Sequence, residues 1–194
     1  MKLFLVRHGQ TTANLEQIYA GQTDVKLTEL GRQQARDIAP ILAPFHFDKV
    51  YSSDLSRAVD TQMLALPGAV AEQTPLLREY DVGSLVGKTF AEVRQMNDDK
   101  LPRIGRTRDY SIYGGENNPL VTKRLRKFLA MLEEDPCENV VAFAHNGILG
   151  AMLALVLDAD YDRAAATSGN CAVHVFEYNG TRWRLLAWNY MAKL

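Results

Sequence analysis

The sequence predicts an α/β fold: a single-domain, three-layer αβα sandwich with a mostly parallel central sheet and an antiparallel hairpin at its C-terminal edge. Short apolar runs that are typical of buried strands alternate with amphipathic stretches up to Leu157. The Asn179-Gly180 pair then separates two alternating runs, which is a strong hairpin signal. With 194 residues the chain is long enough for one sizeable core, and we expect one domain over residues 1–194.

The first elements are a strand and a helix joined by a long loop. Lys2–Val6 is a continuous apolar run after its lysine, as in a strand buried on both faces. Residues 7–26 are polar and contain glycine, which predicts a loop. Residues 27–42 are predicted to be helical with Thr28 as the N-cap. The apolar positions of this helix recur at helical spacing: they are Leu30, Ala35, Ile38 and Leu42.

The middle of the chain repeats this alternation. A second strand is expected in residues 47–54 and a helix in residues 55–66. Residues 72–80 favour a strand that leads into a loop, and residues 88–113 favour a helix followed by a basic loop.

The last elements give the clearest pattern. Residues 118–134 form a strongly amphipathic helix whose apolar face contains Val121, Leu125, Phe128, Leu129 and Leu132. The run NVVAFAHNG, residues 139–147, is a buried strand that ends in a histidine, and residues 148–157 form the next helix. The hairpin then occupies residues 171–189.

Composition and charge exclude several classes of protein. Hydrophobic residues make up 47% and charged residues 23%, and the net charge of −1 does not favour nucleic acid or membrane partners. The longest apolar run, Ile148–Leu157, is too short to cross a bilayer, and no signal peptide is visible. Cys137 and Cys171 are expected to be free thiols, so we expect a cytoplasmic protein.

Two histidines follow buried strands at equivalent positions. His8 and His145 each end a strand, with a glycine one or two residues later. Because ligands bind outside the carboxyl ends of strands in open α/β sheets, both histidines should point to that edge. His46 and His174 lack this context, and we interpret them as structural.

The arginines near these histidines indicate phosphate chemistry. Arg7 precedes His8, and Arg57 follows the second strand. A guanidinium binds phosphate oxygens in pairs, and an imidazole can act as a covalent nucleophile. Neighbouring cations disfavour protonation of the imidazole and keep its lone pair available, which suits phosphoryl transfer to nitrogen. Glu79 lies in a loop expected at the same sheet edge.

Four segments carry a family resemblance. VRHGQTTAN, GQTDVKLTELGRQQA, VYSSDLSRAVDT and VVAFAHNG, in this order, resemble the histidine phosphatase superfamily, the phosphoglycerate-mutase-like family of metal-independent phosphatases and mutases. The likeness is to compact members such as α-ribazole phosphatases and broad-specificity phosphatases. It implies a central mixed sheet flanked by helices, no cofactor, no metal ion and a small phosphorylated metabolite as substrate.

The resemblance also implies roles for individual residues. His8 becomes the phosphohistidine, and Arg7, Arg57 and His145 form the phosphate clamp, with His145 as an imidazolium. Asn14 contacts the phosphoryl group through its amide. Backbone contacts to the substrate are implied for Gly21 and Asn146.

Glu79 is implied to be the proton donor, and it keeps the family spacing to Gly83. The family pattern continues with Gly-x-Trp-Glu-Gly. Here Leu85 and Val86 replace the tryptophan and the glutamate, which bears on local loop shape and substrate choice.

Further basic residues have two interpretations. Arg103, Arg106 and Arg108 belong either to a solvated loop or to a basic rim that meets the far end of an anionic substrate. Residues 114–116 match the family's Gly-Gly-Glu. Lys123, Arg124, Arg126 and Lys127 are interpreted as the solvent-facing side of a helix.

Three functions remain open. The first is a phosphatase that hydrolyses small phosphomonoesters through phosphohistidine. The second is a phosphoglycerate mutase, and the third is an inactive phosphate-binding or interaction module. A metallohydrolase is disfavoured because neither His8 nor His145 has a third ligand near it in sequence. A homodimer through the hairpin edge or an apolar helix face is a further possibility.

Overall fold

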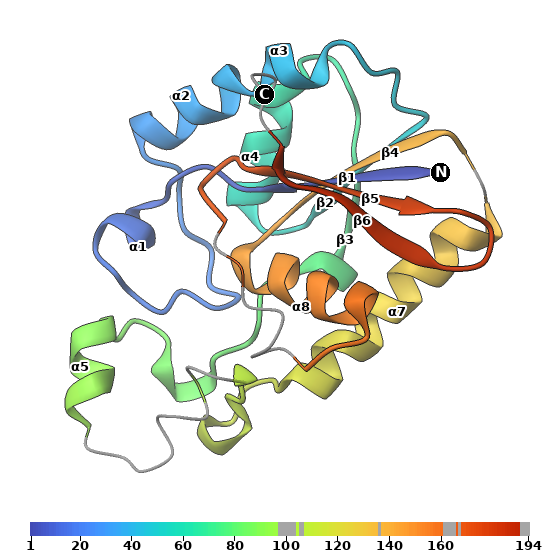
Figure 1. Cartoon of the computed structure of the whole chain (residues 1–194). Helices are drawn as coiled ribbons and strands as arrows, with labels where there is room; N and C mark the ends of the chain where they lie inside the picture. Colours follow the sequence, from blue (N-terminus) through green and yellow to red (C-terminus); the bar gives the residue numbers. More distant parts are fainter. Residues whose placement is uncertain (97–103, 105–106, 136, 161–165, 167, 191–194) are drawn as a thin grey trace.

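A computed structural model describes residues 1–96, 104, 107–135, 137–160, 166 and 168–190 (Figure 1). In this described part, six strands form one sheet in the order β3-β2-β4-β1-β5-β6. Their bounds are β1 Lys2–Arg7, β2 Lys49–Ser53, β3 Glu72–Thr74, β4 Asn139–Ala144, β5 Val173–Tyr178 and β6 Trp183–Tyr190. The arrangement is the mixed α/β fold that the sequence predicted.

Pairing within the sheet is parallel on one side and antiparallel on the other. β3, β2, β4 and β1 are parallel neighbours, whereas β5 is antiparallel to β1 and β6 is antiparallel to β5. The turn between β5 and β6 is closed by Asn179, whose side-chain oxygen accepts from the backbone N–H groups of Thr181 and Arg182. Gly180 has a φ of +92°, which glycine adopts without steric cost. The predicted C-terminal hairpin is confirmed.

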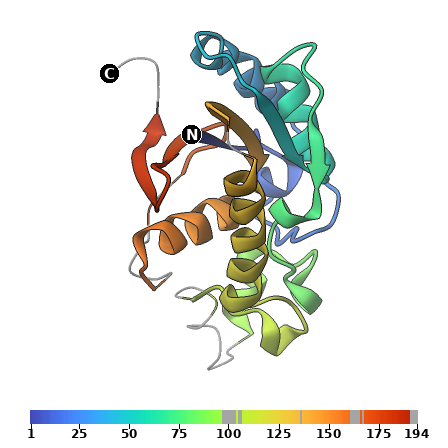
Figure 2. The same ribbon diagram turned by 90° about the vertical axis from the view of Figure 1, so that its right-hand side faces the viewer.

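Helices cover both faces of the sheet (Figures 1 and 2). One face carries α2 Glu29–Asp37, α3 Ala39–Leu42 and α4 Ser56–Ala65, and the other carries α7 Asn118–Glu134 and α8 Asn146–Leu157. Because strand side chains alternate in direction, Phe4 and Val6 of β1 pack on the first face and Leu3 and Leu5 on the second. The three-layer sandwich is confirmed. Within the described ranges, no helix combines the length and apolar character that crossing a membrane requires.

Short helices line the carboxyl edge: one falls within residues 7–26, where the sequence predicted a loop, and one near the start of residues 88–113, where it predicted a helix. Thr11 and Asn14 form a capping box that starts a one-turn helix, α1 Thr12–Leu15. A second short helix, α5 Phe90–Gln95, has its own capping box. Three 3₁₀ segments complete this region: Pro75–Leu77, Gly83–Leu85 and Ser111–Tyr113. Much of the predicted basic loop lies outside the described residues.

Two predicted elements are shorter than expected. β3 ends at Thr74 because Pro75 has no N–H to donate to the ladder. The predicted helix of residues 27–42 begins at its expected cap, Thr28, but is interrupted at Ile38, before Pro40. Leu30 is 54% exposed, so its assignment to the apolar face was wrong.

The sheet topology creates a crevice at one edge. β1 ends at Arg7 and β4 ends at Ala144, and the two strands are parallel neighbours. The chain leaves β1 toward the helices of one face and leaves β4 into α8 on the other face. Such a point of divergence is where α/β sheets bind ligands.

A pair of glycines lets α2 approach the loop after β1. A Cβ on Gly31 would lie 2.8 Å from the backbone nitrogen of Gln10, and a Cβ on Gly9 would collide with Gly31. The backbone N–H of Gly9 is held by the Thr61 hydroxyl at 3.0 Å. The contact therefore fixes the residue that follows His8.

We expect Gly31→Ala to lower the free energy of unfolding by about 2 kcal/mol, because overpacking against backbone outweighs the gain of about 1 kcal/mol that alanine brings to a helix interior. Gln33→Ala, an exposed change on the same helix, should stay within about 0.5 kcal/mol. Urea unfolding of both variants checks this. Equal stability of Gly31→Ala and the unaltered chain would contradict the packing argument.

Candidate active site

His8 follows β1 and is buried, with 5% of its surface exposed. Its Nδ1 lies 2.7 Å from the Gly9 carbonyl oxygen, which can only accept a hydrogen bond. Nδ1 therefore carries the proton. In the neutral ring, Nε2 then keeps the lone pair.

The ring of His145 lies next to that of His8, with the two ring centroids 5.2 Å apart. Its Nδ1 accepts a hydrogen bond from Nε of Arg57 at 3.2 Å. A guanidinium only donates, so Nδ1 is unprotonated and Nε2–H donates to the Ser53 hydroxyl at 2.8 Å. The expectation that His145 is an imidazolium is therefore wrong in this structure. Ser53, at the end of β2, was not singled out from the sequence.

The surroundings of both histidines favour the neutral ring. Burial lowers the pKa of His8 well below its ordinary value, and the charges of Arg57 and Arg7 lower it further. Burial also lowers the pKa of His145, followed by the charge of Arg57. The hydrogen-bond geometry and the electrostatic surroundings thus both favour a neutral His8 ring.

Arg57 is held by backbone carbonyls on the neighbouring loop. It donates from Nη2 to the Gly21 oxygen at 2.8 Å and from Nη1 to the Thr23 oxygen at 3.0 Å. Gly21 has a φ of +53°, and a Cβ there would lie 2.8 Å from Val82. Gly21 therefore holds Arg57 through its carbonyl, in addition to lining the cavity.

Arg7 is fixed by a distant loop. Its Nη1 donates to the carbonyl of Ser168, and its buried Nε has no hydrogen-bond partner among the described residues. A buried donor of this kind is costly unless something accepts its hydrogen bond. Arg7 is accordingly suited to bind an anion.

The loop that holds Arg7 also organises the base of the site. Asn170 donates from Nδ2 to the His8 carbonyl at 3.2 Å and to Oδ1 of Asn14 at 3.3 Å. The Ser168 hydroxyl lies 2.9 Å from Nε2 of His174. His174 is fully buried and supports this loop from β5, which agrees with its structural interpretation.

Two further expectations, for His46 and for the cysteines, can be placed in the structure. The side chain of His46 is 90% exposed and lies 3.8 Å from a carboxylate oxygen of Asp48. It is not among the cavity residues. Both thiols are free, with Cys171 buried and Cys137 partly buried.

Glu79 points its carboxylate at the start of α8. Its Oε1 accepts from the Tyr80 N–H at 2.9 Å, and its Oε2 accepts from the Gly147 N–H at 3.0 Å. A Cβ on Gly147 would collide with Oε1 of Glu79 and lie 2.7 Å from the Tyr80 ring. The glycine of the AHNG run therefore makes room for the carboxylate.

Leu85 and Val86, which depart from the family pattern, differ in burial. Leu85 is fully buried in the core, whereas Val86 is 43% exposed. Gly83 keeps its place in a tight contact with Gly115 and Tyr113, with a φ of +57°. The loop after Glu79 is thus anchored by an apolar side chain.

One cavity of about 910 Å³ lies at this site. Its lining includes the sequence-predicted residues Arg7, His8, Asn14, Gly21, Arg57, Glu79 and Asn146, but not His145. Four aromatic side chains also line the cavity: Tyr19, Tyr80, Phe90 and Tyr110. Arg108 lines the cavity, with its guanidinium carbon 5.9 Å from the centre of the Tyr80 ring. Arg103 and Arg106 lie outside the described residues.

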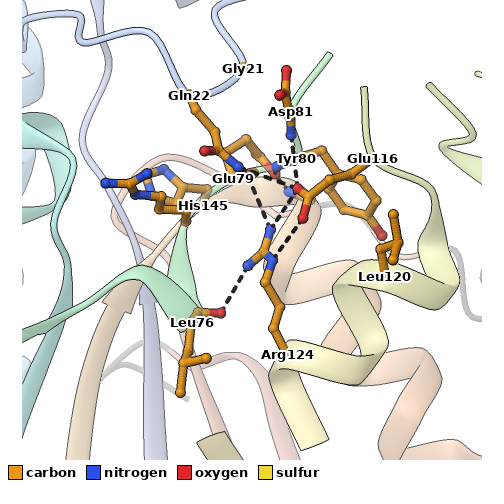
Figure 3. A network of polar contacts seen from close by, with 12 residues as sticks. Gly21, Gln22, Leu76, Glu79, Tyr80, Asp81, Glu116, Leu120, Arg124 and His145 are labelled. Atoms are coloured by element: carbon orange, nitrogen blue, oxygen red, sulfur yellow. Dashed lines mark hydrogen bonds and ion pairs between the residues drawn. The ribbon is translucent and has the colours of Figure 1, made fainter. Parts of the chain in front are cut away.

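One predicted surface arginine is not on the surface. The side chain of Arg124 is only 14% exposed and forms an ion pair with Glu116, whose side chain is 20% exposed (Figure 3). Its interpretation as part of a solvent-facing cluster was wrong. Arg124 is three residues after Val121 and four before Phe128, so it borders the apolar face of α7. This spacing could have indicated from the sequence that Arg124 is partly buried.

Comparison with known proteins decides the family. Residues 3–191 match the histidine phosphatase superfamily (branch 1). The chain belongs to this superfamily. It is 31% identical to a glucosyl-3-phosphoglycerate phosphatase of Mycobacterium tuberculosis, over 100% of this chain and 96% of that one. It is 30% identical to an adenosylcobalamin/alpha-ribazole phosphatase of Salmonella typhimurium, over 81% of this chain and 80% of that one.

Solved structures agree with the sequence relatives. The mycobacterial glucosyl-3-phosphoglycerate phosphatase in complexes with VO3 superimposes with a TM-score of 0.89 at 31% identity, covering 98% of this chain and 99% of that one. The sequence-based resemblance and the interpretation as a phosphoric monoester hydrolase are confirmed at the level of the family.

The buried neutral histidines predict how the stability of this histidine phosphatase depends on pH. Burial lowers the pKa of His174 to about 4 and lowers those of His8 and His145 well below 6.5. The unfolded chain therefore binds more protons than the folded one once the pH falls below about 6.5. Unfolding free energy should fall from there, by at most about 1.4 kcal/mol per pH unit per histidine.

We expect His8→Asn to flatten this dependence below pH 6.5, whereas His46→Asn at the surface should leave it unchanged. Denaturant unfolding at a series of pH values from 8 to about 4.5 measures both slopes. Identical slopes for His8→Asn and the unaltered protein would contradict a neutral buried His8.

Proposed function

We propose that this protein hydrolyses small phosphomonoesters without a metal ion, through a phosphohistidine formed on His8. The observation that carries the proposal is the fixed tautomer of His8, with Nδ1 on the Gly9 carbonyl and Nε2 as the nucleophilic atom in a buried cavity. Two arginines next to this ring supply positive charge.

In the first step, the Nε2 lone pair attacks phosphorus, and the bond from phosphorus to the ester oxygen breaks. Glu79 gives its proton to the departing oxygen, so an alcohol leaves. Arg7 and Arg57 stabilise the charge on the three transferring oxygens, which is the largest catalytic contribution expected in a buried site. His145 holds the Arg57 guanidinium through Nδ1.

In the second step, a water molecule attacks the phosphohistidine. The carboxylate of Glu79 accepts the water proton, the P–N bond breaks, and its electron pair returns to Nε2 of His8. Inorganic phosphate leaves, and Glu79 is again protonated for the next turnover. One carboxyl group thus serves both steps.

The remaining cavity residues bind the substrate. Oδ1 of Asn14 already accepts from Thr11 and Asn170, so its NH₂ group is what Asn14 offers to a phosphoryl oxygen. Asn146 is the first residue of α8, where backbone N–H groups favour anions. The substrate class we propose is a small phosphorylated metabolite of the cytoplasm.

We expect a phosphomonoester substrate labelled with ³²P to label the protein transiently, with an acid-labile, alkali-stable bond. EDTA should not reduce turnover, because arginines supply the charge that a metal ion would provide. His8→Ala should lose the label and nearly all turnover. His46→Ala, an exposed histidine, should retain both.

Rapid-quench experiments and phosphate release measure these outcomes. Labelling that persists in His8→Ala, or turnover that EDTA abolishes, would overturn the proposal. With 2-phosphoglycerate as the substrate, isomer exchange faster than phosphate release would identify a mutase. Anion binding without any label would identify an inactive binding module.

Glu79→Gln should affect substrates according to their leaving groups. An alkoxide needs a proton to leave and a nitrophenolate does not, so kcat/KM should fall about 100-fold or more for an alkyl phosphate and less than about 10-fold for nitrophenyl phosphate. Glu72→Gln, an exposed control, should change neither value. Equal losses for both substrates would remove Glu79 from the donor role.

A further inference from the structure

The backbone carbonyl of Glu79 accepts hydrogen bonds from side chains that do not line the cavity. Its carbonyl oxygen accepts from Nη2 of Arg124 at 3.1 Å and from Nε2 of Gln22 at 3.1 Å (Figure 3). Arg124 also donates from Nη1 to the Leu76 carbonyl at 2.8 Å. One guanidinium on α7 therefore ties together two points of the segment that carries Glu79.

The carboxylate of Glu116 completes this arrangement. It accepts from Nε of Arg124 at 3.2 Å and from Nη2 at 3.1 Å, which fixes the plane of the guanidinium. The same carboxylate accepts from the backbone N–H of Asp81 at 2.9 Å. Glu79 thus lies between Leu76 and Asp81, two residues that the Arg124–Glu116 pair holds by their backbone.

Gln22 connects this pair to the phosphate-binding end. Its Nε2 donates a hydrogen bond to the Glu79 carbonyl oxygen and lies 3.4 Å from Oε2 of Glu116. The preceding residue, Gly21, accepts from Arg57 through its carbonyl. Two adjacent residues, Gly21 and Gln22, therefore connect the backbone of Glu79 to the guanidinium of Arg57.

We propose that Arg124 and Glu116 are positioning residues for the proton transfer by Glu79, with Gln22 as the link to Arg57. This inference rests on the proposed function, because it assigns the pair an effect only through Glu79. Neither Arg124 nor Glu116 is among the residues that line the cavity. Their loss should therefore reproduce the kinetic signature of losing a well-placed acid.

The test compares kcat/KM of Arg124→Met for an alkyl phosphate and for nitrophenyl phosphate, with EDTA present. We expect kcat/KM to fall about 10- to 100-fold for the alkyl phosphate and less than about 3-fold for nitrophenyl phosphate. The alkoxide needs a well-placed proton donor, whereas nitrophenolate leaves without being protonated. Glu116→Gln should act in the same direction. Arg126→Met, an exposed arginine of the same helix, is the matched control and should change neither value.

A double-mutant cycle separates positioning from general damage. In a Glu79→Gln background, Arg124→Met should cost less than about 2-fold further, because its effect passes through a group that is already absent. An undiminished loss in that background, or equal losses for both substrates, would overturn the positioning role. If Glu79→Gln itself shows no leaving-group dependence, the proposed acid fails first and the positioning role fails with it.

Removing a partly buried arginine leaves Glu116 unpaired, so folding of each variant is checked by circular dichroism and thermal unfolding. If Arg124→Met does not fold, Gln22→Met removes the other donor to the Glu79 carbonyl without leaving a charge unpaired. A smaller loss confined to the alkyl phosphate would support the inference. No loss at all would contradict it.

Discussion

The charges of Arg7 and Arg57, which both act on His8, are the constraint on which much of this structure depends. Arg7 and Arg57 lie at the carboxyl edge of the sheet, and burial lowers the pKa of each from its ordinary value. A guanidinium that is largely removed from water is unfavourable unless carbonyl oxygens or a carboxylate compensate its charge. Gly21 and Ser168 supply the carbonyls, and the charge of Glu79 acts on both arginines.

The same charges explain why both neighbouring imidazoles are neutral. A third or fourth cation would face two guanidiniums at short range in a medium that screens charge poorly. The structure uses hydrogen bonds to choose which nitrogen keeps its lone pair. The Gly9 carbonyl selects Nε2 of His8, and the Arg57 guanidinium selects Nδ1 of His145. The hydrogen-bond partners of each ring therefore decide which of its two nitrogens keeps the lone pair.

The position of candidate-site residues at the ends of strands could be predicted from the sequence. Arg7, His8 and His145 were found because a charged or polar group at the end of a buried apolar run must lie at the ligand-binding edge. The residues that hold them were missed. Ser168 contacts Arg7 across 161 positions of sequence, and no local pattern encodes such a closure.

Arg124 shows why a charged helical position misleads. Charge suggests solvent, but its spacing from Val121 and Phe128 places it at the border of the apolar face, where a long side chain can turn toward buried carbonyls. The sequence showed that residues 114–116 match the family pattern, but it did not show what Glu116 contacts. The structure shows that Glu116 forms an ion pair with Arg124.

Glu116 also compensates the positive charge of Arg124. Arg124 is close enough to contribute to the lowered pKa of His145, as a cation additional to Arg7 and Arg57. Paired with a carboxylate at 3.1 Å, it can bind the Glu79 carbonyl while adding little net positive charge behind the site. Without Glu116, the guanidinium of Arg124 would be an uncompensated charge in a partly buried place. The ion pair with Glu116 thus allows Arg124 to bind the Glu79 carbonyl without placing an unpaired positive charge next to Glu79.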